Sequence, residues 1–265
     1  MPLADVNGTV LSYSLEGPEN GAVVMFSNSL ASDRGIWKFQ APVLTGAGYR
    51  VLRYDSRGHG QSVSPAGPYS MEMLSLDALG LMDFLGLDKV HFCGISLGGM
   101  IAQMMGAFHG EHLLSLILCD TTSYTASPEI WDERIETIRK LGTAAVVDAT
   151  IDRWFTKAGQ ARLPDEVNEV RRMILNMSVE GYCGCCSAIR TLNLRQAIGN
   201  ISARTLVIVG EQDVGTPVSE AEYIHGRIAF SKLRIIPDAA HLVNVEQAGR
   251  FNATILEFLK ALEPL

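Results

Sequence analysis

Short apolar segments rich in β-branched residues alternate along this chain with segments of helical periodicity. Segments that are apolar on both faces are typical of parallel strands buried between two layers of helices. Their alternation with helices predicts an α/β fold with a mostly parallel sheet. The segments that we expect to form these strands are Ala22–Ser27, Arg50–Asp55, Lys89–Cys93, Leu114–Asp120, Thr205–Gly210 and Lys232–Ile236.

The N-terminus has a different pattern. Two segments, Ala4–Val10 and Leu11–Leu15, contain or follow the dipeptide Asn7-Gly8. This dipeptide is typical of a tight turn between antiparallel strands. We therefore expect a hairpin that adds an antiparallel edge to the sheet.

One long segment, residues 121–201, contains no convincing strand and shows only helical patterns. Ser127 and Pro128 are typical of an N-cap and a first helical residue, and Gly142 ends the periodic pattern. Further helices are expected near residues 144–155, 165–178 and 180–190. We interpret the segment as a helical lid inserted into a core formed by residues 1–120 and 202–265.

Composition limits the classes of partner. The 265 residues include 22 Lys and Arg against 29 Asp and Glu, a net charge of −7, and no basic cluster stands out. Nucleic acid and membrane partners are therefore not expected, and no run of 18 uncharged apolar residues is present. The first residues lack the pattern of a secretory signal, which predicts a cytoplasmic protein. A small-molecule substrate is expected, and a homo-oligomer is compatible with the sequence.

The five cysteines, at positions 93, 119, 183, 185 and 186, are odd in number and poorly spaced for a disulfide framework. Reduced thiols in a reducing compartment fit this pattern. A zinc site needs two separated pairs of ligands, and Cys183, Cys185 and Cys186 have no evident second pair. We expect no metal and interpret the cluster as small packing residues of a helix.

The segment Gly94-Ile95-Ser96-Leu97-Gly98 follows a predicted strand and begins a predicted helix. This is the context of a nucleophile elbow, in which the serine lies at the apex of a strained turn with its hydroxyl exposed. The two glycines remove Cβ atoms where the strand and the helix approach each other. We predict that Ser96 is a catalytic nucleophile. The alternative is a glycine-rich turn with an incidental serine.

A serine nucleophile needs a general base and an acid that orients the base. In this type of fold the chain order is serine, acid, histidine. Asp213 follows the predicted strand Thr205–Gly210 and is the preferred acid. Glu211 lies nearer to the strand but is expected to point outward. Asp120, at the end of the preceding strand, is the second candidate.

The candidate base is His241, which follows the last predicted strand and lies 28 residues after Asp213. His59 could line a pocket, but it precedes Ser96 and has the wrong chain order. An oxyanion hole needs two N–H donors. We expect them to be the amide of Leu97, directly after the nucleophile, and the amide of Leu30, in the loop after strand Ala22–Ser27.

These residues resemble the α/β-hydrolase superfamily over nearly the whole chain and, more narrowly, the 3-oxoadipate enol-lactonases. In many members of the superfamily the oxyanion loop contains His-Gly, whereas this chain has Asn28-Ser29, as the lactonases do. The resemblance implies an eight-stranded, mostly parallel sheet with helices on both faces and a helical lid. The segments that carry it are Phe26–Leu30, Leu52–Gly60, Gly67–Tyr69, Gly80–Asp83, Phe92–Gly99, Ser127–Trp131, Arg153–Thr156 and Glu180–Tyr182.

The resemblance also implies hydrolysis of a carboxymethyl enol-lactone to 3-oxoadipate, a step of bacterial aromatic degradation that needs no cofactor. The substrate carboxylate needs a cation, and Arg134 is our first candidate because it lies one helical turn after Trp131. Arg190 and Arg153 are alternatives. Trp131 and Trp154 are candidate substrate contacts, although tryptophans at helical spacings more often pack within the lid.

Two other functions remain open. A carboxylesterase, a cofactor-free perhydrolase or a carbon–carbon bond hydrolase would keep the same three catalytic residues and differ in the lid. A receptor-like protein of the same fold would bind its ligand with little turnover. Labelling of Ser96 by a fluorophosphonate without steady turnover would distinguish the receptor.

Overall fold

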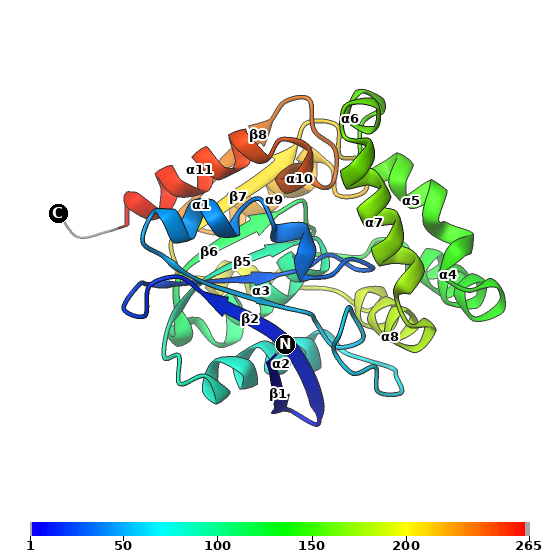
Figure 1. Cartoon of the computed structure of the whole chain (residues 1–265), viewed down its shortest axis with the longest axis horizontal. Helices are drawn as coiled ribbons and strands as arrows, with labels where there is room; N and C mark the ends of the chain where they lie inside the picture. Colours follow the sequence, from blue (N-terminus) through cyan, green and yellow to red (C-terminus); the bar gives the residue numbers. More distant parts are fainter. Residues whose placement is uncertain (1, 263–265) are drawn as a thin grey trace.

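The computed structural model describes residues 2–262, in which a mostly parallel eight-stranded sheet crosses the core (Figure 1). The strand order is β1-β2-β4-β3-β5-β6-β7-β8, and all pairs from β4 to β8 are parallel. The predicted α/β architecture is confirmed, and the ends of the six predicted strands that follow the hairpin agree within two residues. The strands are β1 (Leu3–Val6), β2 (Thr9–Glu16), β3 (Val23–Ser27), β4 (Arg50–Tyr54), β5 (Val90–Ile95), β6 (Leu113–Cys119), β7 (Thr205–Gly210) and β8 (Ser231–Ile236).

The N-terminal hairpin forms as its sequence predicts. Asn7 and Gly8 have φ angles of 45° and 71°, and Val6 pairs with Thr9 across the turn. Positive φ at both central residues matches the right-handed twist of the strands. Strand β2 also pairs antiparallel with β4 and so joins the hairpin to the parallel sheet.

Helices cover both faces of the sheet. In Figure 1, α1 and α11 lie above the sheet and α2 lies below it. The ring of Trp37 packs between Phe26 of β3 and Phe251 of α11, at centroid distances of 4.5 and 6.2 Å. The helices of the core are α1 (Ala41–Gly46), α2 (Met71–Phe84), α3 (Leu97–Phe108), α9 (Val218–Arg227), α10 (Val243–Glu246) and α11 (Ala248–Lys260), with short 3₁₀ helices η1 (Arg34–Trp37) and η2 (Gly110–His112). A further 3₁₀ helix, η4 (Ala197–Asn200), lies at the end of the segment between β6 and β7.

Between β6 and β7 the chain forms five α-helices, which gather at one end of the sheet (Figure 1). We call residues 121–201 the lid. Pro128 is the first residue of α4 and Gly142 ends it, as predicted, but the Ser127 side chain makes no capping hydrogen bond. Helix α6 was not predicted. The lid contains α4 (Pro128–Leu141), η3 (Thr143–Val146), α5 (Val147–Trp154), α6 (Lys157–Arg162), α7 (Pro164–Asn176) and α8 (Val179–Arg190).

Helix α8 holds the lid close to the core. A Cβ atom added to Gly181 would lie 2.2 Å from the carbonyl oxygen of Gly58, so glycines at this contact allow the two backbones to meet. The amide of Tyr69 donates to the carbonyl of Gly184 at 3.3 Å. The lid is therefore anchored to the loop that follows β4.

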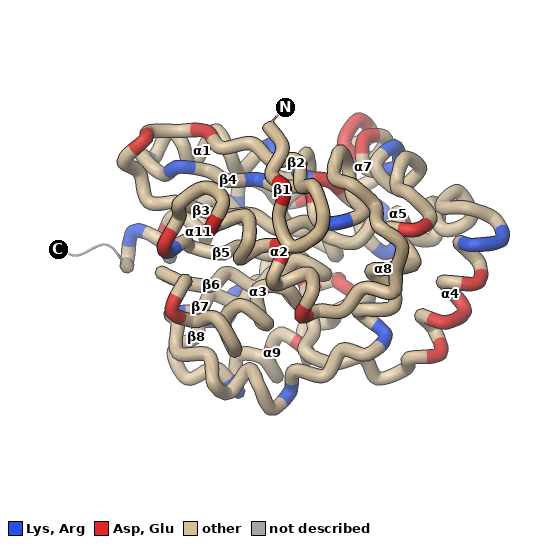
Figure 2. The backbone as a smooth tube through the Cα atoms, turned by 90° about the horizontal axis from the view of Figure 1, so that it is seen from below, with Lys and Arg blue, Asp and Glu red and all other residues tan. Residues whose placement is uncertain are grey.

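Charges of both signs are interspersed along the backbone (Figure 2). Among residues 2–262, no helix combines the length and apolar character needed to cross a membrane.

Candidate active site

The turn between β5 and α3 has the geometry of a nucleophile elbow. Ser96 has φ 55° and ψ −115°, a strained conformation for a residue with a side chain. A Cβ atom on Gly94 would lie 2.0 Å from the carbonyl oxygen of Gly98, and one on Gly98 would lie 2.2 Å from that of Ser27. Both glycines are therefore required by the close approach of strand and helix. Ser96 remains partly exposed at the apex.

Asp213 and His241 meet at the carboxyl ends of β7 and β8. The Oδ2 atom of Asp213 lies 2.7 Å from Nδ1 of His241. The same carboxylate accepts hydrogen bonds from the amides of Gly215 and Thr216, at 2.8 and 3.1 Å, and from the Thr216 hydroxyl at 2.6 Å. These contacts fix the carboxylate, which in turn orients the imidazole. Because Nδ1 faces Asp213, Nε2 is the nitrogen left to face a nucleophile.

The groups around Asp213 also favour the ionised form of its carboxyl group. Burial alone would raise the pKa of this carboxyl, but the neighbouring His241 and the donors around it lower the pKa below its ordinary value. Thr216 completes this arrangement and was not identified from the sequence. The sequence signal that could have identified Thr216 is its position three residues after the acid, because an Asp side chain often accepts hydrogen bonds from the residues of the turn that follows it.

The second candidate acid, Asp120, has a different position. Its Oδ1 accepts from the amide of Gly210 at 2.7 Å, and Oδ2 accepts from that of Val243 at 3.4 Å. Burial raises its pKa well above the usual range, and the nearby Asp213 raises it further. Glu211, the third candidate, is exposed. Of the three carboxyl groups, the structure brings Asp213 into contact with His241.

The predicted oxyanion donors lie on either side of the elbow. Leu97 is the first residue of α3, and amides of a first helical turn have no partner within the helix. Leu30 lies in the turn after β3. In the described part of the chain, neither amide donates to another protein group. Within residues 2–262, no hydrogen bond joins the Ser96 hydroxyl to His241. In enzymes of this type such a contact often shortens only when substrate is bound.

Asn28 holds the loop that carries Leu30. The side chain is fully buried and donates to the carbonyls of Ser29 and Ser32, each at 2.9 Å. Its Oδ1 accepts from the amide and hydroxyl of Ser56, at 3.1 and 2.9 Å. Its own carbonyl accepts from the amide of Gly98 at 3.0 Å. Asn28 therefore connects the Leu30 loop both to the loop after β4 and to the first turn of α3.

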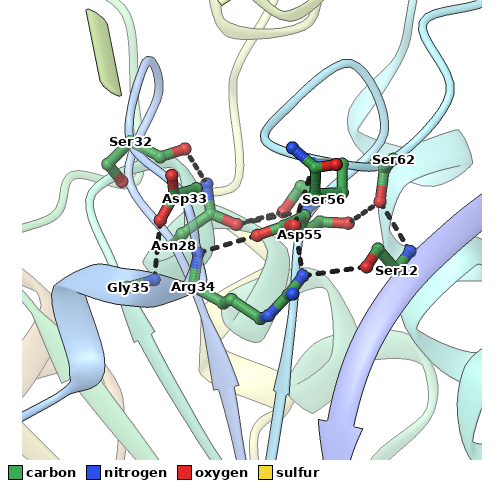
Figure 3. Close-up of polar contacts among 10 residues, drawn as sticks. Ser12, Asn28, Ser32, Asp33, Arg34, Gly35, Asp55, Ser56 and Ser62 are labelled. Carbon is green, nitrogen blue, oxygen red and sulfur yellow. Dashed lines mark hydrogen bonds and ion pairs between the residues drawn. The ribbon is translucent and has the colours of Figure 1, made fainter. Parts of the chain in front are cut away.

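An ion pair supports the same loop from the other side (Figure 3). Arg34 donates from its amide to Asp55 Oδ1 at 2.8 Å, and its guanidinium donates to Oδ2 at 2.5 Å and to the Ser12 hydroxyl at 2.9 Å. Ser62 donates to the Asp55 carbonyl at 2.6 Å. Burial raises the pKa of Asp55, while the amides and the guanidinium around it oppose that shift.

His59 fixes the residue after Leu30. The ring is buried, and its Nε2 accepts from the amide of Ala31 at 3.1 Å while Nδ1 faces the carbonyl of Arg57 at 3.1 Å. Ala31 has φ 65°, a conformation that costs free energy in a residue other than glycine. Burial lowers the pKa of His59 from 6.5 to about 4. The ring is thus a neutral acceptor near neutral pH.

The predicted substrate contacts of the lid form two groups, one against His241 and one around Arg134. Trp154, at the end of α5, is nearly buried, and its ring lies 5.9 Å from that of His241. Trp131 lies on α4, where the guanidinium of Arg134 stacks over its ring at 5.4 Å. The structure therefore places Trp154, of the two tryptophans, against the candidate base.

Arg134 and Arg153 form the second group together with Tyr182 of α8. Both arginines are partly buried, and burial together with the nearby charge of Arg134 lowers the pKa of Arg153. Burial raises the pKa of Tyr182 to about 12 although Arg134 opposes the shift. Among the described residues neither arginine forms an ion pair. Arg190, by contrast, donates to Asp132 at 2.6 Å.

The five cysteine thiols are buried and free. Cys183, Cys185 and Cys186 lie on α8, as packing residues of a helix would. Within residues 2–262, no group of three or more His, Cys, Asp or Glu side chains could hold a metal ion.

Known proteins resemble this chain over nearly its whole length. Residues 22–141 match the family model of the alpha/beta hydrolase fold. The chain is 32% identical to 3-oxoadipate enol-lactonase 1 of Acinetobacter baylyi over 97% of its own length and 95% of that protein. The crystal structure of the enol-lactonase from Burkholderia xenovorans LB400 superposes with a TM-score of 0.95 at 37% identity, covering 98% of this chain and all of that one.

A third relative is a thermophilic esterase from Thermogutta terrifontis, whose structure was solved with malate bound. It superposes with a TM-score of 0.94 at 29% identity, and each chain is covered completely. Lactonases and esterases both cleave a carboxylic ester bond.

Proposed function

Because the chain belongs to the α/β-hydrolase superfamily, we propose that it is a serine hydrolase that opens 3-oxoadipate enol-lactone to 3-oxoadipate. Its similarity to two enol-lactonases, at 32% and 37% identity over nearly the full length, supports the reaction class. The observation that carries the substrate is the pair Arg134 and Arg153, two partly buried lid cations without a carboxylate partner among the described residues.

In the proposed reaction, Ser96 Oγ attacks the lactone carbonyl carbon and its proton passes to His241 Nε2. The Leu30 and Leu97 amides stabilise the oxyanion that forms. Collapse of this intermediate breaks the ring C–O bond and releases an enol oxygen, which takes the proton from His241. The enol then becomes the 3-oxo group, while the acyl chain stays bound to Ser96.

Water completes the cycle. His241 accepts a proton from water, the hydroxide attacks the acyl carbon, and Ser96 regains its proton as the carboxylate leaves. Asp213 keeps the imidazole oriented and stabilises its protonated form. The net reaction consumes one water, and the nucleophile, the general base and the oxyanion donors are all groups of the chain, so these steps require neither a metal ion nor an organic cofactor.

The substrate carboxylate would lie against the guanidinium groups of Arg134 and Arg153. A planar guanidinium can donate two parallel hydrogen bonds to a carboxylate, which gives both affinity and orientation. The malate bound to the related esterase shows that a dicarboxylate can bind to a protein of this type. We further propose that the protein acts in the cytoplasm, where its free thiols would stay reduced.

The test is loss of enol-lactone absorbance, measured for the natural chain and for Ser96→Ala. We expect a kcat/KM of about 10⁵ M⁻¹s⁻¹ or more, within the usual enzyme range. Ser96→Ala should lower kcat by roughly 10⁴-fold or more, as removal of a triad nucleophile does. A variant that keeps more than a few per cent of kcat would exclude Ser96 as nucleophile.

The related esterase supports a second candidate, a broader carboxylesterase. Fast, Ser96-dependent cleavage of p-nitrophenyl acetate with poor turnover of the enol-lactone would favour it. Stoichiometric labelling of Ser96 by a fluorophosphonate with no turnover of either substrate would instead favour a receptor.

A further inference from the structure

Glu246 is a buried acidic residue that the proposed reaction does not use. It ends helix α10, five residues after His241, and only 3% of its surface is exposed. An acidic side chain without water around it is destabilising unless hydrogen bonds replace the water. The hydrogen-bond partners of Glu246 therefore indicate its role.

One side of the carboxylate faces the lid. The amide of Thr156 donates to Oε1 at 3.1 Å and to Oε2 at 3.3 Å, and the Thr156 hydroxyl also donates to Oε1. A Cβ atom on Gly159 would lie 1.8 Å from Oε1, so a glycine is needed for the carboxylate to fit there. Arg162 donates to the main-chain carbonyl of Glu246 at 2.8 Å. The lid segment 156–162 is thus built around this residue.

The other side of the carboxylate faces the loop of the candidate base. The amide of Ala240, the residue before His241, donates to Oε2 at 2.9 Å. The amide of Leu242, the residue after His241, donates to the carbonyl of Trp154 at 3.1 Å. Both main-chain neighbours of His241 are therefore tied to the lid segment 154–156, one of them through Glu246.

We propose that Glu246 is a positioning residue that sets the place of the His241 ring and couples it to the lid segment 154–162. The carboxylate accepts from Thr156 and from Ala240 at once, so a shift of this lid segment moves the main chain that carries His241. Trp154 lies on the same segment and against the His241 ring, which gives the coupling a second contact. The inference rests on the proposed role of His241 as general base.

The test is Glu246→Gln, which keeps the size of the side chain. A glutamine has one accepting oxygen, and its NH₂ group would face the N–H groups of either Thr156 or Ala240. We expect kcat for p-nitrophenyl acetate and for the enol-lactone to fall about 10- to 100-fold, with KM changed less than about threefold, because the loss acts on the chemical step. The rate of Ser96 labelling by a small fluorophosphonate should fall in parallel with kcat.

A second pair of variants separates positioning from folding. Thr156→Val removes the hydroxyl at nearly constant shape and should lower kcat about 3- to 10-fold, whereas Thr156→Ser should stay within about twofold of the natural chain. Exposed Glu222 on α9 provides the matched control. Glu222→Gln should leave kcat, KM and the labelling rate unchanged. If Glu246→Gln does not fold, the Thr156 pair decides.

Two outcomes would overturn the inference. One is a lower midpoint of thermal unfolding for Glu246→Gln with kcat per folded molecule and labelling rate unchanged, which would make Glu246 a purely structural group. The other is a raised KM with constant kcat. Failure of the proposed function has a different signature: Ser96→Ala would retain hydrolysis whatever the Glu246 variants do.

Discussion

The polar groups that the core and the lid contribute to the candidate site differ in how strongly other protein groups hold them. On the core side, Asn28, Asp55 and Asp213 each make several hydrogen bonds to protein groups fixed by the loops after the strands. On the lid side, Arg134 and Arg153 are partly buried cations that form no ion pair with any described residue.

This difference separates catalysis from recognition. Groups that stabilise a transition state are most effective when their orientation is fixed before the substrate binds. A cation that recognises a carboxylate must not already be neutralised by a protein carboxylate, because exchanging one partner for another gains little free energy. The comparison therefore predicts that core variants lower kcat, whereas lid variants act on the binding of charged substrates.

The largest effect should come from the core acid. Asp213→Asn removes the charge that orients and stabilises His241, and we expect kcat to fall by about 10³- to 10⁴-fold, as for the acid of other triads. Asp120→Asn should cost less than about tenfold, because Asp120 contacts the amides of Gly210 and Val243 and not the imidazole. Steady-state kinetics on p-nitrophenyl acetate measure both. Equal losses, or a larger loss in Asp120→Asn, would reverse the assignment.

The next effect concerns the buried His59 of the core and the pH dependence of the free energy of unfolding. The pKa of buried His59 is about 4, against 6.5 for an exposed histidine, so the unfolded chain binds more protons between these pH values. This group's contribution to stability is therefore complete above pH 6.5 and is lost as the pH falls toward 4, by about 3 kcal/mol in total.

His59→Gln keeps an acceptor for the Ala31 amide but cannot be protonated. The free energy of unfolding, measured with urea at pH 7, 5.5 and 4, should fall less steeply for this variant than for the natural chain. The carboxyl groups titrate in both proteins and cancel in the difference. Parallel curves would show that His59 is not buried in its neutral form.

The smallest of the three effects belongs to the lid. Arg134→Ala should lower kcat/KM for the carboxylated lactone about 10- to 100-fold, mainly through KM, because it removes a charge-assisted contact of about 1.5–3 kcal/mol. Cleavage of the neutral p-nitrophenyl acetate should change less than about threefold. Arg153→Ala should act in the same direction.

Arg190→Ala is the matched control on the lid, because Arg190 is already paired with Asp132. It should leave both substrates within about threefold of the natural chain. If Arg134→Ala weakens both substrates equally, or if Arg190→Ala has the larger effect on the lactone, the arginine pair is not the carboxylate site.

Much of the core could be predicted from the sequence because its signals are local. Gly94 is needed by a backbone contact only four residues away, with Gly98, and the Gly-x-Ser-x-Gly pattern itself is contained in five consecutive residues. Asp213 follows the fully buried strand β7 and His241 follows the edge strand β8, and parallel strands end at the same edge of the sheet. Their contact, at 2.7 Å, follows from chain order and topology together. The catalytic roles of these residues remain predictions.

The supporting residues could not be predicted in this way. Asn28 was noted in the sequence only as a replacement for His-Gly in the oxyanion loop, although it connects two loops and a helix. Glu246 ends a four-residue helix that also contains the polar Asn244, and its partner Thr156 is 90 positions away. The local sequence therefore does not distinguish Glu246 from an exposed polar residue and does not identify its partner.

By itself, the sequence determined the alternation of strands and helices, the N-terminal hairpin, the strained turn at Ser96 and the order of the candidate catalytic residues, because periodicity and turn chemistry act over a few residues. The tertiary structure was needed to establish which carboxyl group contacts His241, which partly buried lid arginines form no ion pair with a described residue, and which residues join the lid to the candidate base. These properties depend on burial and on contacts between segments far apart in the chain, and both arise only when the lid packs against the core.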